Sequence, residues 1–400
     1  MIIRNMPPLH LTYCLNVHPG ETWEENLAAI RTHTLAVRDQ VAPGRTFGLG
    51  LRLSRRAAET LGNPEVLADF KAFLNAENLY AFTINGFPYG AFHGQPVKTE
   101  VYRPDWTTRE RLDYTLLLAK ILARLLPDNT TGSISTVPLG YRFHFGERPP
   151  LSEMTIHLAE CAIGLRALHA ATGKEIHLGL EPEPDCLLET TRDVIRYFER
   201  TLLSQGAPYV AERLSCTRQE AEVILRRHIG ICFDTCHLAI QFENLSDSLL
   251  LLSNYGIRLS KVQLSSALEV SPTPLARRTL AAFIDPVYLH QVTGSVSSDT
   301  SPHESFPDLP EALASPLSPE SESECWRIHF HLPLYYRGMD SIRTTVNAMD
   351  KRFWEILKRS PVDHCEIETY TFHVLPPALR DKGVEGSIVG EYAWVQSEIE

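Results

Sequence analysis

The amino-acid sequence predicts an α/β protein, specifically a (β/α)8 TIM barrel. Apolar residues recur along the chain with periods that switch between about 2 and about 3.6, which is typical of strands that alternate with helices. Polar residues stand at the ends of most predicted strands, and only a closed barrel brings all such ends together. These residues are His18, Asn85, Glu181, Asp234, Gln263, His331 and Glu368.

Nine segments have the pattern of strands, which is one more than the barrel needs. They cover residues 10–17, 46–53, 79–85, 132–138, 176–181, 229–234, 258–264, 326–332 and 365–370. Two explanations stay open: residues 326–332 form a loop element, or one early segment lies outside the barrel.

Helices are predicted between these segments from the amphipathic pattern and from capping signals. Thr22 with Glu25 and Thr217 with Glu220 have the spacing of capping boxes, which indicates that a helix begins at each. Further amphipathic segments cover residues 64–75, 108–126, 152–172, 191–203 and 344–358.

The composition excludes several classes of protein. The chain has 400 residues, of which 44% are hydrophobic and 22% are charged, so it can form a sizeable core. No run approaches the ~18 apolar residues of a membrane helix, and the N-terminus lacks the pattern of a secretory signal. We therefore expect a cytoplasmic protein whose eight cysteines are small buried residues rather than disulfides.

Charge is distributed unevenly along the chain. The formal net charge of −11 argues against a nucleic-acid partner. Residues 295–324 contain seven acidic residues and no Lys or Arg, so the rest of the chain carries only −4. Because this segment is also rich in Ser and Pro, it predicts a disordered acidic insertion. We expect a single barrel domain over residues 1–380 with an insertion at 265–325, and a C-terminal tail at 381–400.

Three short segments end in carboxylates at predicted strand ends: LGLEPEPDCLLET (178–190), IGICFDTCHLAIQFE (229–243) and HCEIETYTFHVLP (364–376). Converging buried carboxylates repel one another unless a cation lies between them, so we expect a divalent metal. Glu366 and Glu368 share one face of the last strand, and Glu368 lies nearer the C-terminal end, where barrel sites lie. Glu368 is therefore the predicted ligand, with Glu366 a layer deeper.

The run GICFDTCH, with LEPEP upstream and EIET downstream, resembles the xylose isomerase-like barrel superfamily. Its members include sugar isomerases, epimerases and type IV apurinic endonucleases. The segments TYCLNVHPGETW, VYRPDWTTRERLDYT and FHLPLYYRG look like those of the metabolite traffic protein EboE group. The EboE resemblance implies membrane-associated export partners.

The superfamily resemblance implies that Glu181, Asp234 and Glu368 are metal ligands and that His237 is a ligand or a substrate contact. Gln263 stands where the superfamily commonly has a ligating His. An amide oxygen in that place would shift the site from zinc toward Mg or Mn, or require His331 as the replacement ligand.

Several candidate residues have a plainer structural explanation. The carboxylates could be buried partners of arginines such as Arg52. Turn geometry or packing could also account for residues that follow the first strand or lie in loops over the predicted barrel mouth. The candidate substrate-binding residues of this kind are His18, Asn85, Phe87, His93 and Trp106.

Together these observations predict a metal-dependent isomerase or epimerase that acts on a sugar, a polyol or a sugar-like metabolite. The reaction would be a proton transfer next to a metal-bound carbonyl, with Glu181 and Glu368 as base and acid and His237 orienting a hydroxyl. The alternatives are an EboE-like binding or traffic protein without catalysis, and a phosphoester hydrolase of the endonuclease type. The hydrolase would need a basic groove, which the nearly neutral body does not offer.

Overall fold

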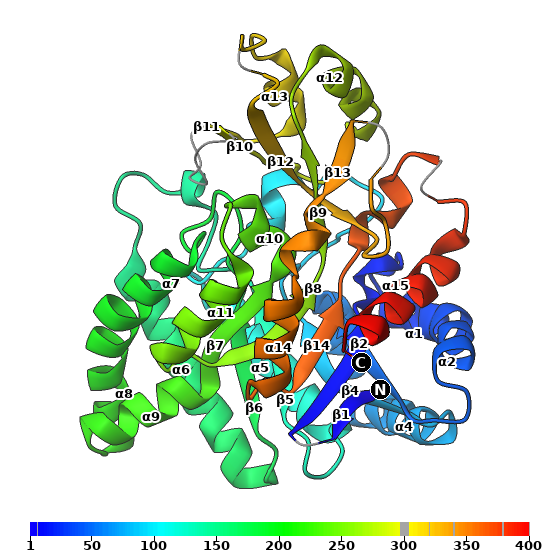
Figure 1. The fold of residues 1–400 in the computed structure, drawn as a ribbon. Coiled ribbons are helices and arrows are strands. Elements are labelled where there is room, and N and C mark those ends of the chain that lie inside the picture. Colours follow the sequence, from blue (N-terminus) through cyan, green and yellow to red (C-terminus); the bar gives the residue numbers. More distant parts are fainter. Residues whose placement is uncertain (6, 297–303, 320, 339–340, 378–379, 400) are drawn as a thin grey trace.

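The protein is a closed parallel β-barrel surrounded by helices (Figure 1). The computed structural model describes residues 1–5, 7–296, 304–319, 321–338, 341–377 and 380–399. Around the barrel the strands follow the order β2-β14-β8-β7-β6-β5-β4-β3, and a parallel bridge between Cys14 and Gly50 connects the last strand to the first. The predicted eight-stranded barrel is confirmed.

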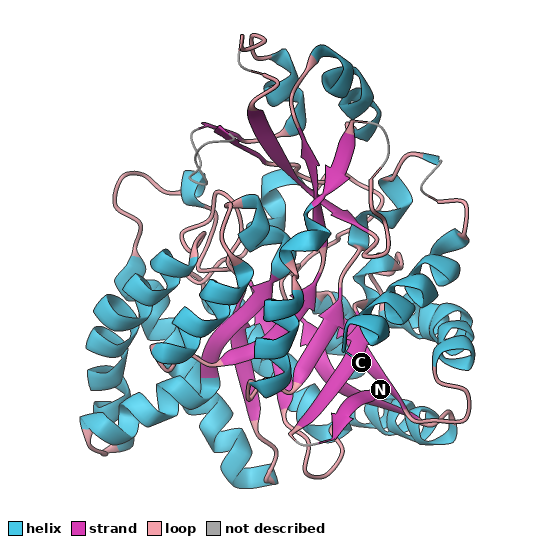
Figure 2. Cartoon of the chain, in the orientation of Figure 1, coloured by secondary structure: helices cyan, strands magenta, loops and turns pink. Residues whose placement is uncertain are grey.

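The barrel strands are buried along almost their whole length, because one face meets the barrel interior and the other meets the helices (Figure 2). Their bounds are β2 Pro8–Tyr13, β3 Phe47–Arg52, β4 Leu79–Asn85, β5 Gly132–Thr136, β6 Ile176–Leu180, β7 Ile229–Asp234, β8 Leu259–Leu264 and β14 His364–Ile367. A short strand, β1 (Ile2–Asn5), pairs antiparallel with β2.

A second, antiparallel sheet lies above the C-terminal ends of the barrel strands (Figure 1). Its strand order is β11-β10-β12-β9-β13. The ninth predicted strand is part of this sheet as β12, so it is neither a loop nor a barrel strand. The bounds are β9 Ser266–Val270, β10 Val292–Val296, β11 Glu304–Phe306, β12 Glu324–Leu332 and β13 Ile342–Thr344. The predicted insertion at 265–325 therefore extends further, to residue 344.

The helices begin where local capping predicts. Thr22 and Thr217 each accept a hydrogen bond from the backbone of the glutamate three residues later, and both capping boxes are complete. No helix in the described ranges is long and apolar enough to cross a membrane. The α-helices are α1 Trp23–Ala29, α2 Leu35–Val41, α3 Arg55–Leu61, α4 Pro64–Ala76, α5 Arg109–Leu125, α6 Leu151–Thr172, α7 Thr191–Tyr197, α8 Ala207–Leu214, α9 Arg218–His228, α10 Thr235–Ile240, α11 Leu245–Asn254, α12 Pro274–Leu280, α13 Leu309–Ala314, α14 Lys351–Arg359 and α15 Gly383–Ile399.

Part of the acidic segment 295–324 is folded, which corrects the expectation of disorder for its described residues. Residues 297–303 and 320 lie outside the described residues. In α13, Leu309 and Ala312 are fully buried in the main core, because their i,i+3 spacing puts them on one face. The Asp308 carboxylate accepts hydrogen bonds from the backbone of His290 at 3.0 Å and from Lys98 Nζ at 2.5 Å.

Within the predicted C-terminal tail at 381–400, residues Gly383–Ile399 form α15, which packs on α2. Tyr392 and Val395 are fully buried in the core. Glu391 is 1% exposed, and its Oε1 accepts hydrogen bonds from Thr369 Oγ1 at 2.6 Å and from the backbone of Leu334 at 3.2 Å. The last helix therefore ties the second sheet to the barrel.

Glu391 gives the stability of the protein a testable pH dependence. Burial raises the pKa of Glu391 from 4.5 to about 7. Between these values the folded protein keeps a proton that the unfolded chain has lost, so the stability contribution falls as the pH rises. Glu391→Gln keeps the accepting oxygen but cannot ionise. We expect it to leave the melting temperature nearly unchanged at pH 5 and to raise the free energy of unfolding at pH 8, by roughly 1–3 kcal/mol.

Calorimetric melting of both proteins at the two pH values measures this difference. An equal shift at pH 5 and pH 8 would show that the ionisation of Glu391 is not its cause.

Candidate metal centre at the barrel mouth

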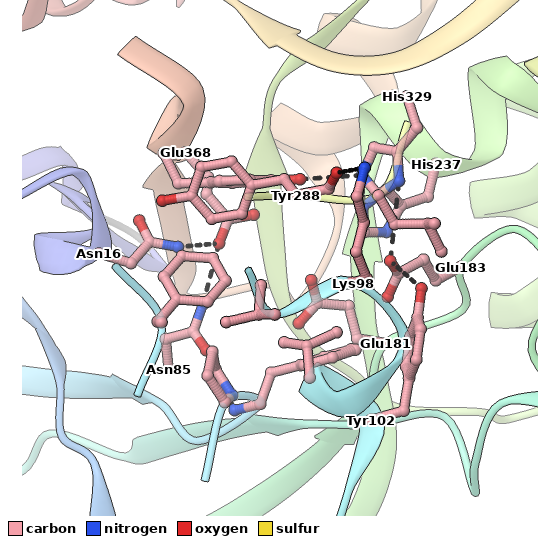
Figure 3. A pocket seen from close by; sticks show the side chains of 17 residues that line it. Asn16, Asn85, Lys98, Tyr102, Glu181, Glu183, His237, Tyr288, His329 and Glu368 are labelled. Atoms are coloured by element: carbon pink, nitrogen blue, oxygen red, sulfur yellow. Dashed lines mark hydrogen bonds and ion pairs between the residues drawn. The ribbon is translucent and has the colours of Figure 1, made fainter. Parts of the chain in front are cut away.

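A pocket lies at the C-terminal ends of the barrel strands, and the second sheet contributes to its wall (Figure 3). Polar side chains from distant parts of the chain meet in it: Asn16, Asn85, Glu181, Glu183, His237 and Glu368 follow or end barrel strands, and His329 comes from β12. Aromatic side chains complete the wall: Phe87, Phe92, Tyr102, Tyr288 and Tyr370.

Two buried histidines hold their rings by the same kind of hydrogen bond. Nδ1 of His237 lies 3.0 Å from the carbonyl oxygen of Pro182, and Nδ1 of His331 lies 2.8 Å from that of Glu368. Because a carbonyl oxygen only accepts, each Nδ1 must be the donor. In the neutral rings the Nε2 atoms therefore carry lone pairs, which is the form in which imidazole binds a metal.

His329 follows the same pattern through a side-chain amide. Its Nδ1 lies 2.7 Å from Gln291 Oε1, and Gln291 Nε2 donates to the carbonyl oxygen of Pro184 at 3.2 Å, which fixes the orientation of the amide. Nδ1 of His329 is thus also a donor, and its Nε2 carries a lone pair in the neutral ring.

The three Nε2 atoms face a common point. Ligand atoms of His237, His329 and His331 lie within 4.8 Å of one another, and Nε2 of His237 is 3.1 Å from Nε2 of His329. Two facing lone pairs repel unless a cation lies between them. That cation is either a proton on His237 or a metal ion, and His331 Nε2 has no hydrogen-bond partner among the described residues.

Carboxylates approach His237 from β6 and β7. Asp234 ends β7 and caps α10: its Oδ1 accepts from the backbone of Cys236 at 2.7 Å and from Ser265 Oγ at 2.7 Å. Its Oδ2 lies 3.8 Å from His237 Nε2. Within the described part of the chain, Asp234 Oδ2 and Glu181 Oε2 are buried without a hydrogen-bond partner. Ligand atoms of Glu181, Asp234 and His237 also lie within 4.8 Å of one another.

Glu368 occupies the other side of the pocket. Its Oε1 accepts from the amides of Asn16 at 2.8 Å and Asn85 at 2.9 Å, and Figure 3 shows it beside these two residues, with Glu181 between them and the histidines. Among the described residues, the ligand clusters at the barrel mouth do not include Glu368. The expectation that Glu368 is a ligand stays a prediction: two amide donors orient its Oε1, and its Oε2 lies 4.0 Å from His331 Nδ1.

Burial dominates the electrostatics of these groups. It raises the pKa of Glu181 and of Glu368, and repulsion from the Asp234 carboxylate raises both further. Burial also raises the pKa of Glu183 to about 7. For Asp234, burial acts in the same direction, but the charges of His237 and His331 outweigh it and lower the pKa. Burial and mutual repulsion therefore both disfavour the charged forms of Glu181 and Glu368 when no cation is present.

Glu366 lies one layer deeper, as predicted. It forms a buried ion pair with Lys261 on β8, and both side chains are fully buried. Burial alone would lower the pKa of Lys261, but the Glu366 charge raises it. Gly50 makes room for this pair, since a Cβ there would lie 2.2 Å from Glu366 Oε1.

The predicted ligand role of Gln263 stays a prediction: β8 pairs it in register with Asp234 of the mouth, but its side-chain oxygen is already engaged. Gln263 also pairs in register with Glu366, a layer below Glu368, and its Oε1 accepts from Cys232 Sγ at 2.8 Å. His331 stands with the ligand atoms. The donor set is therefore rich in imidazole, which favours zinc over magnesium.

Three of the five candidate substrate-binding residues are not among the residues that line the pocket, and their predicted role stays a prediction. His18 bonds Tyr13 and stacks on His33, with ring centroids 4.5 Å apart. Trp106 is fully buried in the core. His93 lies behind the pocket, where its Nε2 is 2.8 Å from the carbonyl oxygen of Asn16. Asn85 and Phe87 do line the pocket.

The sequence interpretation missed four polar residues of the site: Asn16, Tyr102, Glu183 and Gln291. Glu183 stands two residues after Glu181 in LEPEP, so the second carboxylate of that motif was a usable signal. Tyr102 donates to Glu183 Oε1 at 2.8 Å and ends a short 3-10 helix that is far from Glu183 in the sequence. No local pattern marks Tyr102 or Gln291.

No protein-family model and no curated protein matches the chain. The IolI protein with a bound zinc atom is a solved structure with 11% sequence identity and a TM-score of 0.48, covering 98% of both chains. L-ribulose 3-epimerase shares 10% identity with a TM-score of 0.47, covering 98% of this chain and 94% of its own. A xylose isomerase domain protein from Alicyclobacillus acidocaldarius shares 10% identity with a TM-score of 0.43, covering 98% of both.

These neighbours are xylose isomerase-like barrel proteins, as the sequence motifs predict. At 10–11% identity the likeness concerns the fold alone. The narrower resemblance to the EboE group stays a prediction.

The buried ion pair gives a stability prediction that is separate from the metal. Glu366→Gln leaves the Lys261 ammonium buried without a counter-charge, and we expect it to lower the free energy of unfolding by roughly 3–5 kcal/mol. Glu366→Gln combined with Lys261→Met removes both charges and should recover much of this loss. Urea denaturation measures both variants, and a zinc titration should show that binding at the mouth is retained. Loss of zinc binding from a folded Glu366→Gln protein would contradict the placement of Glu366 in a layer below the metal site.

Proposed function

We propose that the protein is a divalent-metal-dependent isomerase or epimerase that acts on a sugar, a polyol or a sugar-like metabolite. The observation that carries the proposal is the donor pattern at the mouth. His237, His329 and His331 each donate from Nδ1 to an oxygen and turn Nε2 toward one point. Asp234 and Glu181 bring carboxylate oxygens to within 4.8 Å of the ligand atom of His237.

The donor set fits a divalent ion, with zinc the best match and manganese the next. His237, His331, Asp234 and Glu181 would hold it, with His329 beside them. When bound, the ion supplies Lewis acidity toward a carbonyl oxygen and a neighbouring hydroxyl of the substrate. The hydrogen bonds from each Nδ1 fix the rings before binding, so little ordering is needed.

Proton transfer is assigned to the two carboxylates that line the pocket on different strands. Glu368 keeps its Oε1 bound to Asn16 and Asn85, which leaves Oε2 to accept a proton from the carbon next to the carbonyl. Glu181 reaches the pocket from β6 and can return a proton. Return to the opposite face of the same carbon inverts it, whereas return to the neighbouring carbon isomerises the substrate.

The lining of the pocket suits an unphosphorylated substrate. Lys98 is the only Lys or Arg among the described residues that line it, and its Nζ already donates to the carbonyl oxygens of Asp285 and Tyr288 and to Asp308. A phosphate group would therefore face carboxylates. The aromatic side chains offer flat apolar surfaces to the C–H face of a sugar ring.

Metal binding is the first test. We expect the metal-free protein to take up zinc in calorimetric titrations, with affinity falling as the pH is lowered because protons then compete for the histidines. Asp234→Asn and His237→Gln should each weaken binding at the mouth by roughly tenfold or more. Gln263→Leu is the matched control from the same barrel interior, and it should bind as the natural protein does. A metal-free protein that takes up no divalent ion would overturn the proposal.

Deuterium exchange tests the chemistry. The zinc or manganese form is incubated in heavy water with a panel of ketoses and polyols, and incorporation at carbon is followed by NMR. We expect exchange with at least one compound, and Glu368→Gln should abolish it while zinc binding is retained. His18→Gln, outside the pocket, is the control that should keep the exchange. Saturable binding of a compound without any exchange would favour a binding or traffic role instead.

A further inference from the structure

A second group of potential ligands lies at the opposite end of the barrel. His177 is on β6, His364 begins β14, and Asp363 directly precedes it. Their ligand atoms lie within 4.8 Å of one another, and both histidines are fully buried. These residues stand at the N-terminal ends of their strands, so this basal cluster is separate from the pocket at the mouth.

His177 is the unusual member of the basal cluster. Its side chain is fully buried, and within the described residues neither ring nitrogen has a hydrogen-bond partner. A neutral imidazole always presents one N–H and one lone pair, and burying both without partners is costly. Such a side chain normally marks a bound water or ion. The ring stacks on His364 with centroids 5.6 Å apart, which directs it into the cluster.

The other two members are held in place by hydroxyl groups. His364 Nδ1 lies 2.9 Å from Ser133 Oγ, and its Nε2 lies 3.4 Å from Thr131 Oγ1, which is a long contact. The Thr131 hydroxyl also donates to Asp363 Oδ2. Among the described residues, no Lys or Arg forms an ion pair with Asp363 within 4.0 Å. The charge of Asp363 is therefore available to a cation.

The charge surrounding the cluster is compatible with a cation. Arg258 acts electrostatically on His177, His364 and Asp363, which by itself would oppose a metal. Its guanidinium, however, lies 2.5 Å from Glu175 Oε1, so its charge is largely compensated. A surface hollow lined by His10, Tyr80 and Thr130 opens beside the cluster, and the ring of His10 lies 5.9 Å from that of His364. This hollow offers a path for entry.

We infer that His177, His364 and Asp363 form a second metal site, a zinc site at the base of the barrel. Two imidazoles and one carboxylate are a common zinc donor set with three protein ligands, and water completes the coordination. The ion would connect β6 to β14, which lie three strands apart in the barrel, and so would brace its base. This site does not depend on the proposed enzymatic function.

The test uses the full chain with one site removed at a time. Asp234→Asn weakens zinc binding at the mouth, and we expect this protein to keep about one equivalent of zinc after dialysis and to melt at a higher temperature when zinc is added. His177→Phe on the same background should lose that equivalent and the thermal shift. Cobalt, used as the probe in place of zinc, should give the visible absorption of a tetrahedral site in the first protein only.

Two controls keep the result interpretable. His228 is another buried histidine on the neighbouring helix, but its Nδ1 is bonded to the carbonyl oxygen of Ile176 at 2.8 Å, so His228→Phe should leave the stoichiometry unchanged. Asp363→Asn keeps the acceptor for Thr131 and should weaken binding by roughly tenfold or more without unfolding the barrel. Asp363→Asn replaces His177→Phe in the test if the His177→Phe protein fails to fold.

The two proposals fail separately. If Asp234→Asn binds no zinc while the natural protein binds one equivalent, the basal site is overturned, His177 is solvated by water, and the mouth stands. If the natural protein binds one equivalent that His177→Phe alone removes, the basal site stands and the metal at the mouth is overturned.

Discussion

The arrangement of the barrel mouth depends on one constraint: imidazole and carboxylate lone pairs are concentrated where water is excluded. Three histidines turn Nε2 inward, and Asp234 and Glu181 add carboxylate oxygens at the same place. Such a cluster is unfavourable by itself, because buried lone pairs and negative charges repel. The surrounding hydrogen bonds do not relieve this repulsion. They fix the directions of the ligand atoms, which is what a metal site requires.

The barrel interior compensates its charges layer by layer. At the mouth the carboxylates outnumber the cations, whereas one layer deeper Glu366 is neutralised by Lys261. Beneath that pair, His177 and His364 occupy the base of the barrel. In the middle layer the two charges therefore neutralise each other, although Glu366 Oε1 and Gln263 Nε2 have no hydrogen-bond partner among the described residues. The layers at the mouth and at the base are the two in which His, Asp and Glu side chains bring potential metal-ligand atoms close together.

The second sheet contributes residues to the site at the barrel mouth. Its strand β12 carries His329 and His331, and the segment before β10 supplies Gln291, which fixes the His329 ring. Its helix α13 is tied to the pocket wall through Asp308 and Lys98. A barrel alone would present only the carboxylates and His237. The two imidazoles that join His237 in the donor set come from the inserted sheet.

The sequence by itself determined the barrel, the strand positions and the carboxylates, because periodicity and strand-end chemistry are local properties of the chain. It also placed Glu368 above Glu366, since alternation along a strand fixes both the face and the order. Only the tertiary structure decided the partners. Gln263 bonds Cys232, Glu366 pairs with Lys261, and α13 is folded although its segment is acidic and rich in proline. These contacts join residues far apart in sequence. Composition and spacing are local properties, so they do not predict which distant side chain a buried group will contact.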